Sequence, residues 1–118
     1  MKDFKLTKEE VELLDGINFR EIDNEDFKYT GSCHSKYIQY SFIYKSELSK
    51  IIDNSCNIQV SLFYLGQDRY TLRIEDLYIK DTLINLSEEF VNKIKEDIIE
   101  NKFYLFKNFN TTTLKMVF

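Results

Sequence analysis

The sequence of 118 residues contains 43% hydrophobic and 31% charged residues, with eight Tyr, ten Phe and no Pro. A chain of this length and apolar content can bury enough surface to fold unaided, which excludes a disordered protein and favours one domain over residues 1–118. The formal net charge of -4 and the pI near 5.0 disfavour direct binding to nucleic acid and other polyanions.

A short helix is predicted near the N-terminus, followed by a strand. Thr7 and Glu10 have the spacing of a capping box, in which each side chain accepts a backbone hydrogen bond at the start of a helix. The helix is therefore expected over residues 8–15, and Gly16 can end it. Residues 18–22 are predicted as a short strand.

The middle of the sequence shows the alternating pattern of β-strands. The polar stretch 24–36 is interpreted as a connection. Apolar and polar residues then alternate over residues 36–45, 58–64 and 70–75, which predicts three strands, each with one buried face. Between the first two of these strands, residues 46–53 are predicted as a helix of two turns.

The clearest helix is predicted to begin at Ser87 and to run to about Lys102. Its apolar residues form one stripe, and polar residues cover the other side. Lys93 and Asp97 have the spacing of an ion pair on the surface of a helix. Beyond this helix, residues 103–118 are predicted to form a last hairpin.

These elements predict an α+β fold with an antiparallel-rich sheet of about five to six strands, one long helix in the C-terminal half and two short helices. Residues 36–108 have the element order of a ferredoxin-like fold. The first crossover in this segment is short for joining parallel strands, so an antiparallel meander with helices packed on one face is the competing topology.

The segment around Cys33 and His34 is the most chemically suggestive part of the sequence. A cysteine nucleophile needs a base beside it, but adjacent residues in an extended chain point to opposite sides. Cys33, His34 and Cys56 offer three ligands where a structural zinc site needs four, so no metal is expected. No P-loop or GxGxxG motif occurs, and no cofactor is expected.

Glu75 and Asp76 form a carboxylate pair at a change in the strand pattern, which indicates a bulge or the end of a strand. Together with Cys33 and His34, they define an alternative site for a small-molecule-binding or enzymatic domain.

The N-terminus is charged throughout, and no apolar run approaches the length that spans a bilayer. We therefore expect a cytoplasmic protein with no membrane contact. Cys33 and Cys56 are too few for a disulfide framework and are expected to be free thiols.

The leading hypothesis is a non-enzymatic protein-binding module. The first 30 residues carry nine acids against five bases, which is the whole surplus of negative charge and favours a partner with a basic surface. Eight Tyr exceed what a small core can satisfy, so several should be exposed, as at protein interfaces. The predicted binding residues are Glu21, Asp23, Glu25, Asp26, Tyr29 and Tyr37.

The composition, rich in Lys, Asn and Ile, is typical of proteins from low-GC bacteria and their phages, where small acidic inhibitors and immunity or anti-defence proteins are common. Such an inhibitor is the form of protein-binding module that we favour. A structural, self-assembling subunit, such as a homodimer, is a further alternative.

Overall fold

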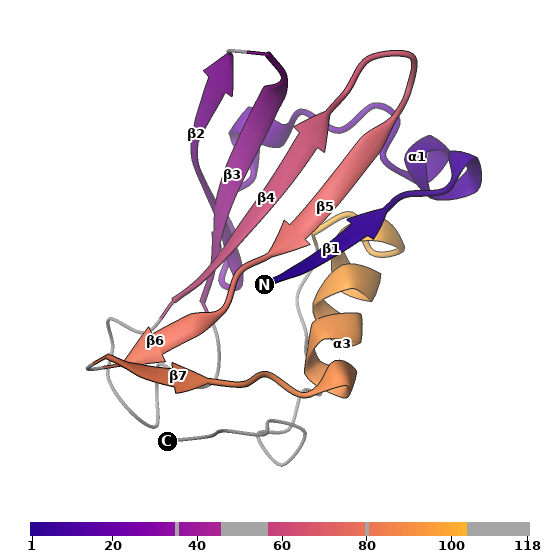
Figure 1. Cartoon of the computed structure of the whole chain (residues 1–118). Helices are drawn as coiled ribbons and strands as arrows, with labels where there is room; N and C mark the ends of the chain where they lie inside the picture. The colour runs from indigo at the N-terminus through magenta and orange to yellow at the C-terminus, as the bar shows by residue number, and fades with distance from the viewer. Residues whose placement is uncertain (35, 46–56, 80, 104–118) are drawn as a thin grey trace.

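The structure is a computed structural model that describes residues 1–34, 36–45, 57–79 and 81–103 (Figure 1). Within these ranges, five strands form an antiparallel sheet in the order β1-β5-β4-β3-β2, and β6 pairs with β7 in a second sheet. The predicted α+β class is therefore confirmed. The strands are β1 (Lys2–Lys5), β2 (Phe27–His34), β3 (Ile38–Tyr44), β4 (Ile58–Tyr64), β5 (Tyr70–Ile74), β6 (Leu77–Ile79) and β7 (Thr82–Ile84), and the helices are α1 (Lys8–Leu13), the 3-10 helix η1 (Phe19–Glu21) and α3 (Glu88–Ile99).

The two helices begin at the capping residues predicted from the sequence. In α1, the Thr7 hydroxyl accepts the N–H of Glu10 at 3.1 Å, and the Glu10 carboxylate accepts the N–H of Thr7 at 3.0 Å. In α3, the Ser87 hydroxyl accepts the N–H of Phe90 at 3.1 Å. Neither helix in the described part of the chain is long and apolar enough to cross a membrane.

The C-terminal end of α3 lies at Ile99, earlier than the predicted Lys102, because the chain turns sharply there. Lys102 and Phe103 have φ angles of 54° and 68°, in the left-handed region. The N–H of Phe103 donates to the carbonyl of Asp97 at 3.0 Å, which satisfies one of the last carbonyls of the helix. The turn brings the Phe103 side chain into the core.

The predicted connection over residues 24–36 is wrong, because this stretch contains β2. The Asn24 side chain accepts the N–H of Phe27 at 2.7 Å and forms a tight turn before the strand. The pairing of β2 with β3 shifts register between Tyr29 and Gly31. This bulge interrupts the alternation by which a strand is detected in a sequence.

The strand predicted at residues 18–22 is also wrong, since η1 occupies this position. The Asn18 side chain accepts the N–H of Arg20 at 3.2 Å, a local bond that replaces strand pairing. Phe19 is thereby buried in the core. The edge strand β1 was not predicted, because Phe4 is its one residue packed against the core.

The suggested ferredoxin-like topology for residues 36–108 is wrong. That fold requires the strands joined by its first crossover to be parallel, whereas β3 and β4 are antiparallel neighbours, paired from Ile38 with Tyr64 onward. The competing meander with helices on one face is the observed arrangement. The helix predicted at residues 46–53 lies outside the described residues, as does the final hairpin except for Phe103, which lies in a turn.

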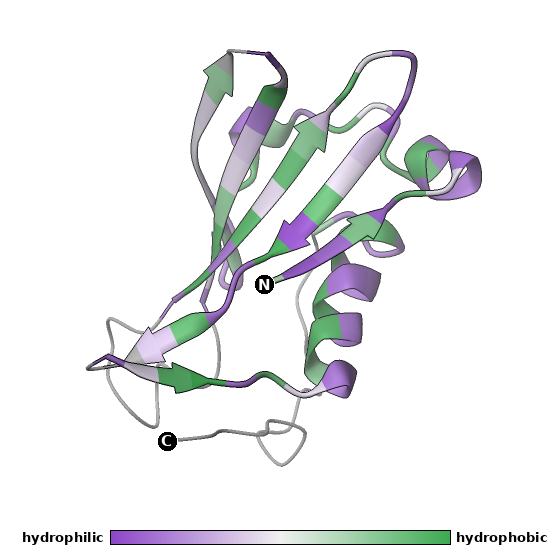
Figure 2. Ribbon diagram, in the orientation of Figure 1, coloured by the Kyte–Doolittle hydropathy of each residue, from purple (hydrophilic) through white to green (hydrophobic). Residues whose placement is uncertain are grey.

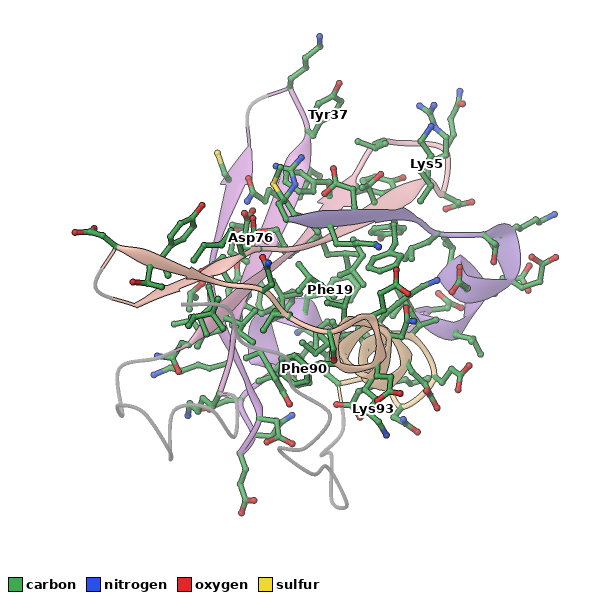
Figure 3. All side chains as sticks on the ribbon, turned by 60° about the horizontal axis from the view of Figure 1, so that its bottom comes forward. Lys5, Phe19, Tyr37, Asp76, Phe90 and Lys93 are labelled. Carbon is green, nitrogen blue, oxygen red and sulfur yellow. The ribbon has the colours of Figure 1, made fainter. Side chains whose placement is uncertain are left out.

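The core lies between one face of the five-stranded sheet, here called the inner face, and the helical segments. Figure 2 shows that the hydrophobic side of α3 turns toward the interior and its hydrophilic side turns away. Phe19 and Phe90 lie between sheet and helix (Figure 3). Lys95 of α3 contacts both α1 and β1. Its ammonium group lies 3.2 Å from the Glu10 carboxylate of α1 and 5.0 Å from the centre of the Phe4 ring of β1.

Candidate functional site

The predicted acidic residues gather at the start of β2. Asp23, Glu25 and Asp26 lie in the turn that leads into this strand, and Glu21 ends η1. Glu21, Asp23 and Glu25 are exposed, whereas Asp26 is half-buried. The structure therefore brings these four residues into one neighbourhood, as expected for residues so close in the sequence.

The two tyrosines predicted to join this surface lie elsewhere. Tyr29 is half-buried on the inner face, with its ring 5.7 Å from that of Phe42. Tyr37 is 46% exposed, but it lies in the β2–β3 turn at the opposite end of β2 from the acidic residues. Tyr78 in β6, at 63%, is another exposed phenol. The structure thus provides exposed tyrosines, but not beside the acidic turn.

The residues of the alternative site do not come together. Cys33 and His34 end β2, whereas Glu75 and Asp76 follow β5 at the opposite end of the sheet. Asp76 forms an ion pair with the N-terminal amine of Met1. The change of strand pattern at this pair is the end of β5, since β6 belongs to the second sheet. No group of three metal-ligating side chains occurs within the described ranges.

A pocket of about 670 Å³ lies beside the helical N-terminal segment. Ten residues of the segment 8–20 line it, together with Tyr40 of β3, Tyr70 of β5 and Asp68 of the β4–β5 turn. The volume lies within the range of small-molecule sites. Sequence patterns did not indicate this pocket, because its lining comes from separate segments that only the fold brings together.

Three aromatic side chains are among the residues that line the pocket. The Phe19 ring centre lies 4.9 Å from that of Tyr40 and 6.4 Å from that of Tyr70. Tyr64 also packs against Tyr70, with ring centres 5.0 Å apart. Burial raises the pKa of Tyr70, and the neighbouring phenols and the Asp68 carboxylate add to this effect. The Tyr70 phenol is therefore neutral at physiological pH.

The opposite face of the five-stranded sheet, here called the outer face, is covered by no described helix. Its central strands present five uncharged polar residues, two apolar residues and one charged residue. The side chains on this face of β3, β4 and β5 are Gln39, Ser41, Ile43, Gln59, Ser61, Phe63, Thr71 and Arg73.

The one charge among these eight side chains is neutralised. The Arg73 guanidinium donates two hydrogen bonds to the Asp3 carboxylate, at 2.8 and 3.1 Å, and lies 5.1 Å from the centre of the Phe63 ring. Hydrogen bonding to Arg73 lowers the pKa of Asp3 and keeps the carboxylate ionised. The Gln39 amide donates to the Ser41 and Ser61 hydroxyls at 3.3 and 3.2 Å. The centre of the outer face is thus polar but carries little net charge, whereas Lys5 of β1 and Lys28 of β2 lie toward its edges.

Asp97 is a buried carboxyl group on the inner side of α3, where it is 1% exposed. Its carboxylate oxygens accept no hydrogen bond of normal length and angle from the described residues. Burial raises the pKa of Asp97 to about 7, Asp26 adds to the effect, and the Asn101 side chain opposes it. The ion pair predicted with Lys93 does not form, because Lys93 points away from the sheet (Figure 3).

No protein-family model, curated protein or solved structure matches this chain.

Proposed function

We propose that this chain is a non-enzymatic protein-binding module whose partner docks on the outer face of the five-stranded sheet. The observation that supports this proposal is the low charge at the centre of that face, on β3, β4 and β5. One of its eight central side chains is charged, although 31% of the chain is charged. The cores of protein interfaces are similarly poor in charged residues and rich in aromatic residues and Arg.

The energetics of desolvation support the same proposal. Burying an unpaired charge under a partner is costly, but Arg73 already has a carboxylate partner in Asp3 and an aromatic neighbour in Phe63. The amide of Gln39 is likewise hydrogen-bonded within the face. A partner could therefore cover the centre of this face without stripping water from an isolated charge.

The first test compares capture of partners from a lysate of the source organism by two variants of equal charge. In the first, Gln59 and Thr71, both half-buried on the outer face, are replaced by lysine. We expect at least about tenfold weaker binding of a stoichiometric partner, because two lysines would be desolvated in the interface.

The matched control variant carries Asn85→Lys and Asn92→Lys, two exposed positions in the segment that includes α3. It should retain the partner, since it adds the same charge away from the outer face. Equal capture by both variants would contradict docking on the outer face. A concentration-dependent dimer that only the outer-face variant abolishes would contradict a heterologous partner and assign the face to a second copy of the chain.

We also propose that the partner carries a basic surface, as a target of a small acidic inhibitor or of an immunity or anti-defence protein would. The exposed carboxylates of Glu21, Asp23 and Glu25 in one neighbourhood support this proposal, because like charges that are concentrated locally attract an oppositely charged partner.

For this second proposal, we expect Glu21→Lys with Glu25→Lys to weaken binding about tenfold at low salt and to reduce its salt dependence. The control is Glu89→Lys with Glu96→Lys, which makes the same charge change on the exposed side of α3. The measurement is the dissociation constant for the captured partner at two salt concentrations. Equal losses in the two variants would show that net charge, rather than the acidic turn, attracts the partner.

A further inference from the structure

The pocket beside α1 and η1 combines aromatic rings with carboxylates, which suggests a ligand of a particular chemistry. Phe19, Tyr40 and Tyr70 line it, with ring centres 4.9 and 6.4 Å from Phe19. The face of an aromatic ring carries partial negative charge, and a cation held against several rings is attracted to it. The pocket lies on the inner side of the sheet, so it is separate from the outer face proposed to bind a protein.

The charged residues of the pocket also favour a cation. Three carboxylates, those of Glu12, Asp15 and Asp68, line it together with the bases Lys8 and Arg20. Lys8 and Glu12 are one helical turn apart on α1, a spacing at which their charges offset each other. Of the remaining charged residues, Asp15 and Asp68 are negative and Arg20 is positive, so the lining of the pocket has a net negative charge.

Asp68 lies in the tight turn between β4 and β5 and lines the pocket. Gln67 and Asp68 have φ angles of 54° and 57°, and the N–H of Arg69 donates to the carbonyl of Gly66 at 3.1 Å, which closes a tight hairpin. The Arg69 guanidinium also donates to backbone carbonyls of this hairpin, at 3.1 and 3.2 Å. Among the described residues no ion pair joins it to Asp68. The Asp68 carboxylate is therefore available beside Tyr70, and it adds to the effect of burial in raising the pKa of that phenol.

We infer that this pocket is a binding site for an organic cation, a guanidinium or ammonium group that rests against Phe19, Tyr40 and Tyr70 and pairs with the carboxylate of Asp68. The rings supply the cation–π contact, and Asp68 supplies the opposite charge at the rim. An anion is disfavoured in the same place, because the ring faces and the excess of carboxylates repel it. The group belongs either to a free small molecule or to an Arg or Lys side chain of another protein.

The test is a titration of the full chain with arginine amide, followed by NMR of the labelled tyrosine rings. We expect saturable shifts of the Tyr40 and Tyr70 signals, with a dissociation constant of about 1 mM or tighter and weaker binding at high salt. Citrulline amide has a neutral urea in place of the guanidinium and should bind at least about fivefold more weakly. Equal shifts with the two compounds, or no saturable shift, would overturn the inference.

Variants locate the site. Asp68→Asn should weaken binding of arginine amide about tenfold, and asparagine tolerates the positive φ of this turn. Asp81→Asn is the matched control, because Asp81 is also exposed at a positive φ, of 65°, in a distant turn, and it should leave binding unchanged. Tyr40→Leu removes a ring and should weaken binding at least about fivefold. Equal effects of Asp68→Asn and Asp81→Asn on the binding of arginine amide would contradict a binding site at Asp68.

Two further arms distinguish the sources of the cation. Choline represents a free small molecule, and an acetylated Gly-Arg-Gly amide represents a protein side chain. Tighter binding of one than of the other identifies the source, and either result supports cation binding. Failure of all the cations would leave the outer-face proposal untouched, because the lysine variants on that face test it independently.

Discussion

Replacing Asp97 with asparagine is expected to raise the free energy of unfolding at pH 8 by on the order of 3 kcal/mol. The carboxyl group is 1% exposed and its oxygens accept no hydrogen bond of normal length and angle from the described residues, so its ionised form is unfavourable in the folded protein. Asparagine keeps nearly the same volume but carries no charge. The measurement is urea unfolding, followed by circular dichroism, of the wild type and the variant from pH 5 to pH 8.

The sign of the pH dependence follows from the raised pKa. The folded protein holds the Asp97 proton up to about pH 7, whereas the unfolded chain loses it near the ordinary value of 3.8. Between these values the folded state binds more protons, so stability is highest below 3.8 and is lost as the pH rises through 7. The wild type should therefore become less stable from pH 5 to pH 8, and Asp97→Asn should flatten this slope.

The groups around Asp97 define the controls. Asp26 and Glu96 add to the raised pKa of Asp97, and Asn101 opposes it. Glu96 is exposed on the same helix, so Glu96→Gln should change stability by less than about 0.5 kcal/mol and keep the pH slope. An Asp97→Asn variant that is less stable than the wild type at pH 8, with an unchanged slope, would contradict a buried carboxyl group that titrates near neutrality.

Replacing Phe103 with alanine is expected to cost about 3–5 kcal/mol of stability. Phe103 is 1% exposed, and its ring centre lies 4.7 Å from that of Phe42 and 5.3 Å from that of Phe27. Its carbonyl also accepts the Asn24 amide at 2.6 Å, which joins the end of α3 to the turn before β2. Removing the ring would leave a cavity where these elements meet. The measurement is the unfolding free energy from urea titration.

Phe63→Ala is the matched control. Phe63 lies half-buried on the outer face and stacks on the Arg73 guanidinium at 5.1 Å, so its loss should cost about 1 kcal/mol. If Phe103→Ala fails to fold, Phe103→Leu, which keeps most of the volume, should still fold with a loss of about 1–2 kcal/mol. Equal losses for Phe103→Ala and Phe63→Ala would show that Phe103 does not complete the core.

Local signals predicted the elements whose patterns are uninterrupted. The strands β3, β4 and β5 follow from alternation, and α1 and α3 follow from their caps at Thr7 and Ser87. β2 was missed because the bulge between Tyr29 and Gly31 breaks its alternation, and η1 was missed because a single side chain, Asn18, starts it. A single bulge or a single capping side chain is a weaker signal in a sequence than a periodic pattern of apolar residues.

At Asp97 the helix was predicted correctly, but the surroundings of the side chain were not. Its spacing from Lys93 suggested a surface ion pair, but its spacing from Phe90 and Ile94 also places it on the buried stripe of α3. The two interpretations differ in the width of the helix face that packs against the sheet. That width depends on the neighbouring strands and cannot be predicted from the sequence of the helix alone.

The amino-acid sequence by itself therefore determined the α+β class, the main strands, the caps of the helices and the acidic turn, because each depends on residues close together in the chain. The tertiary structure alone decided which sheet face is covered, where Cys33 lies relative to Glu75, and that Phe19, Tyr40, Asp68 and Tyr70 share one pocket. These features depend on strand order and on the packing of distant segments. The physical reason is that these contacts join residues far apart in the sequence. Their free energy depends on how the whole core packs, so a pattern of neighbouring residues does not predict them.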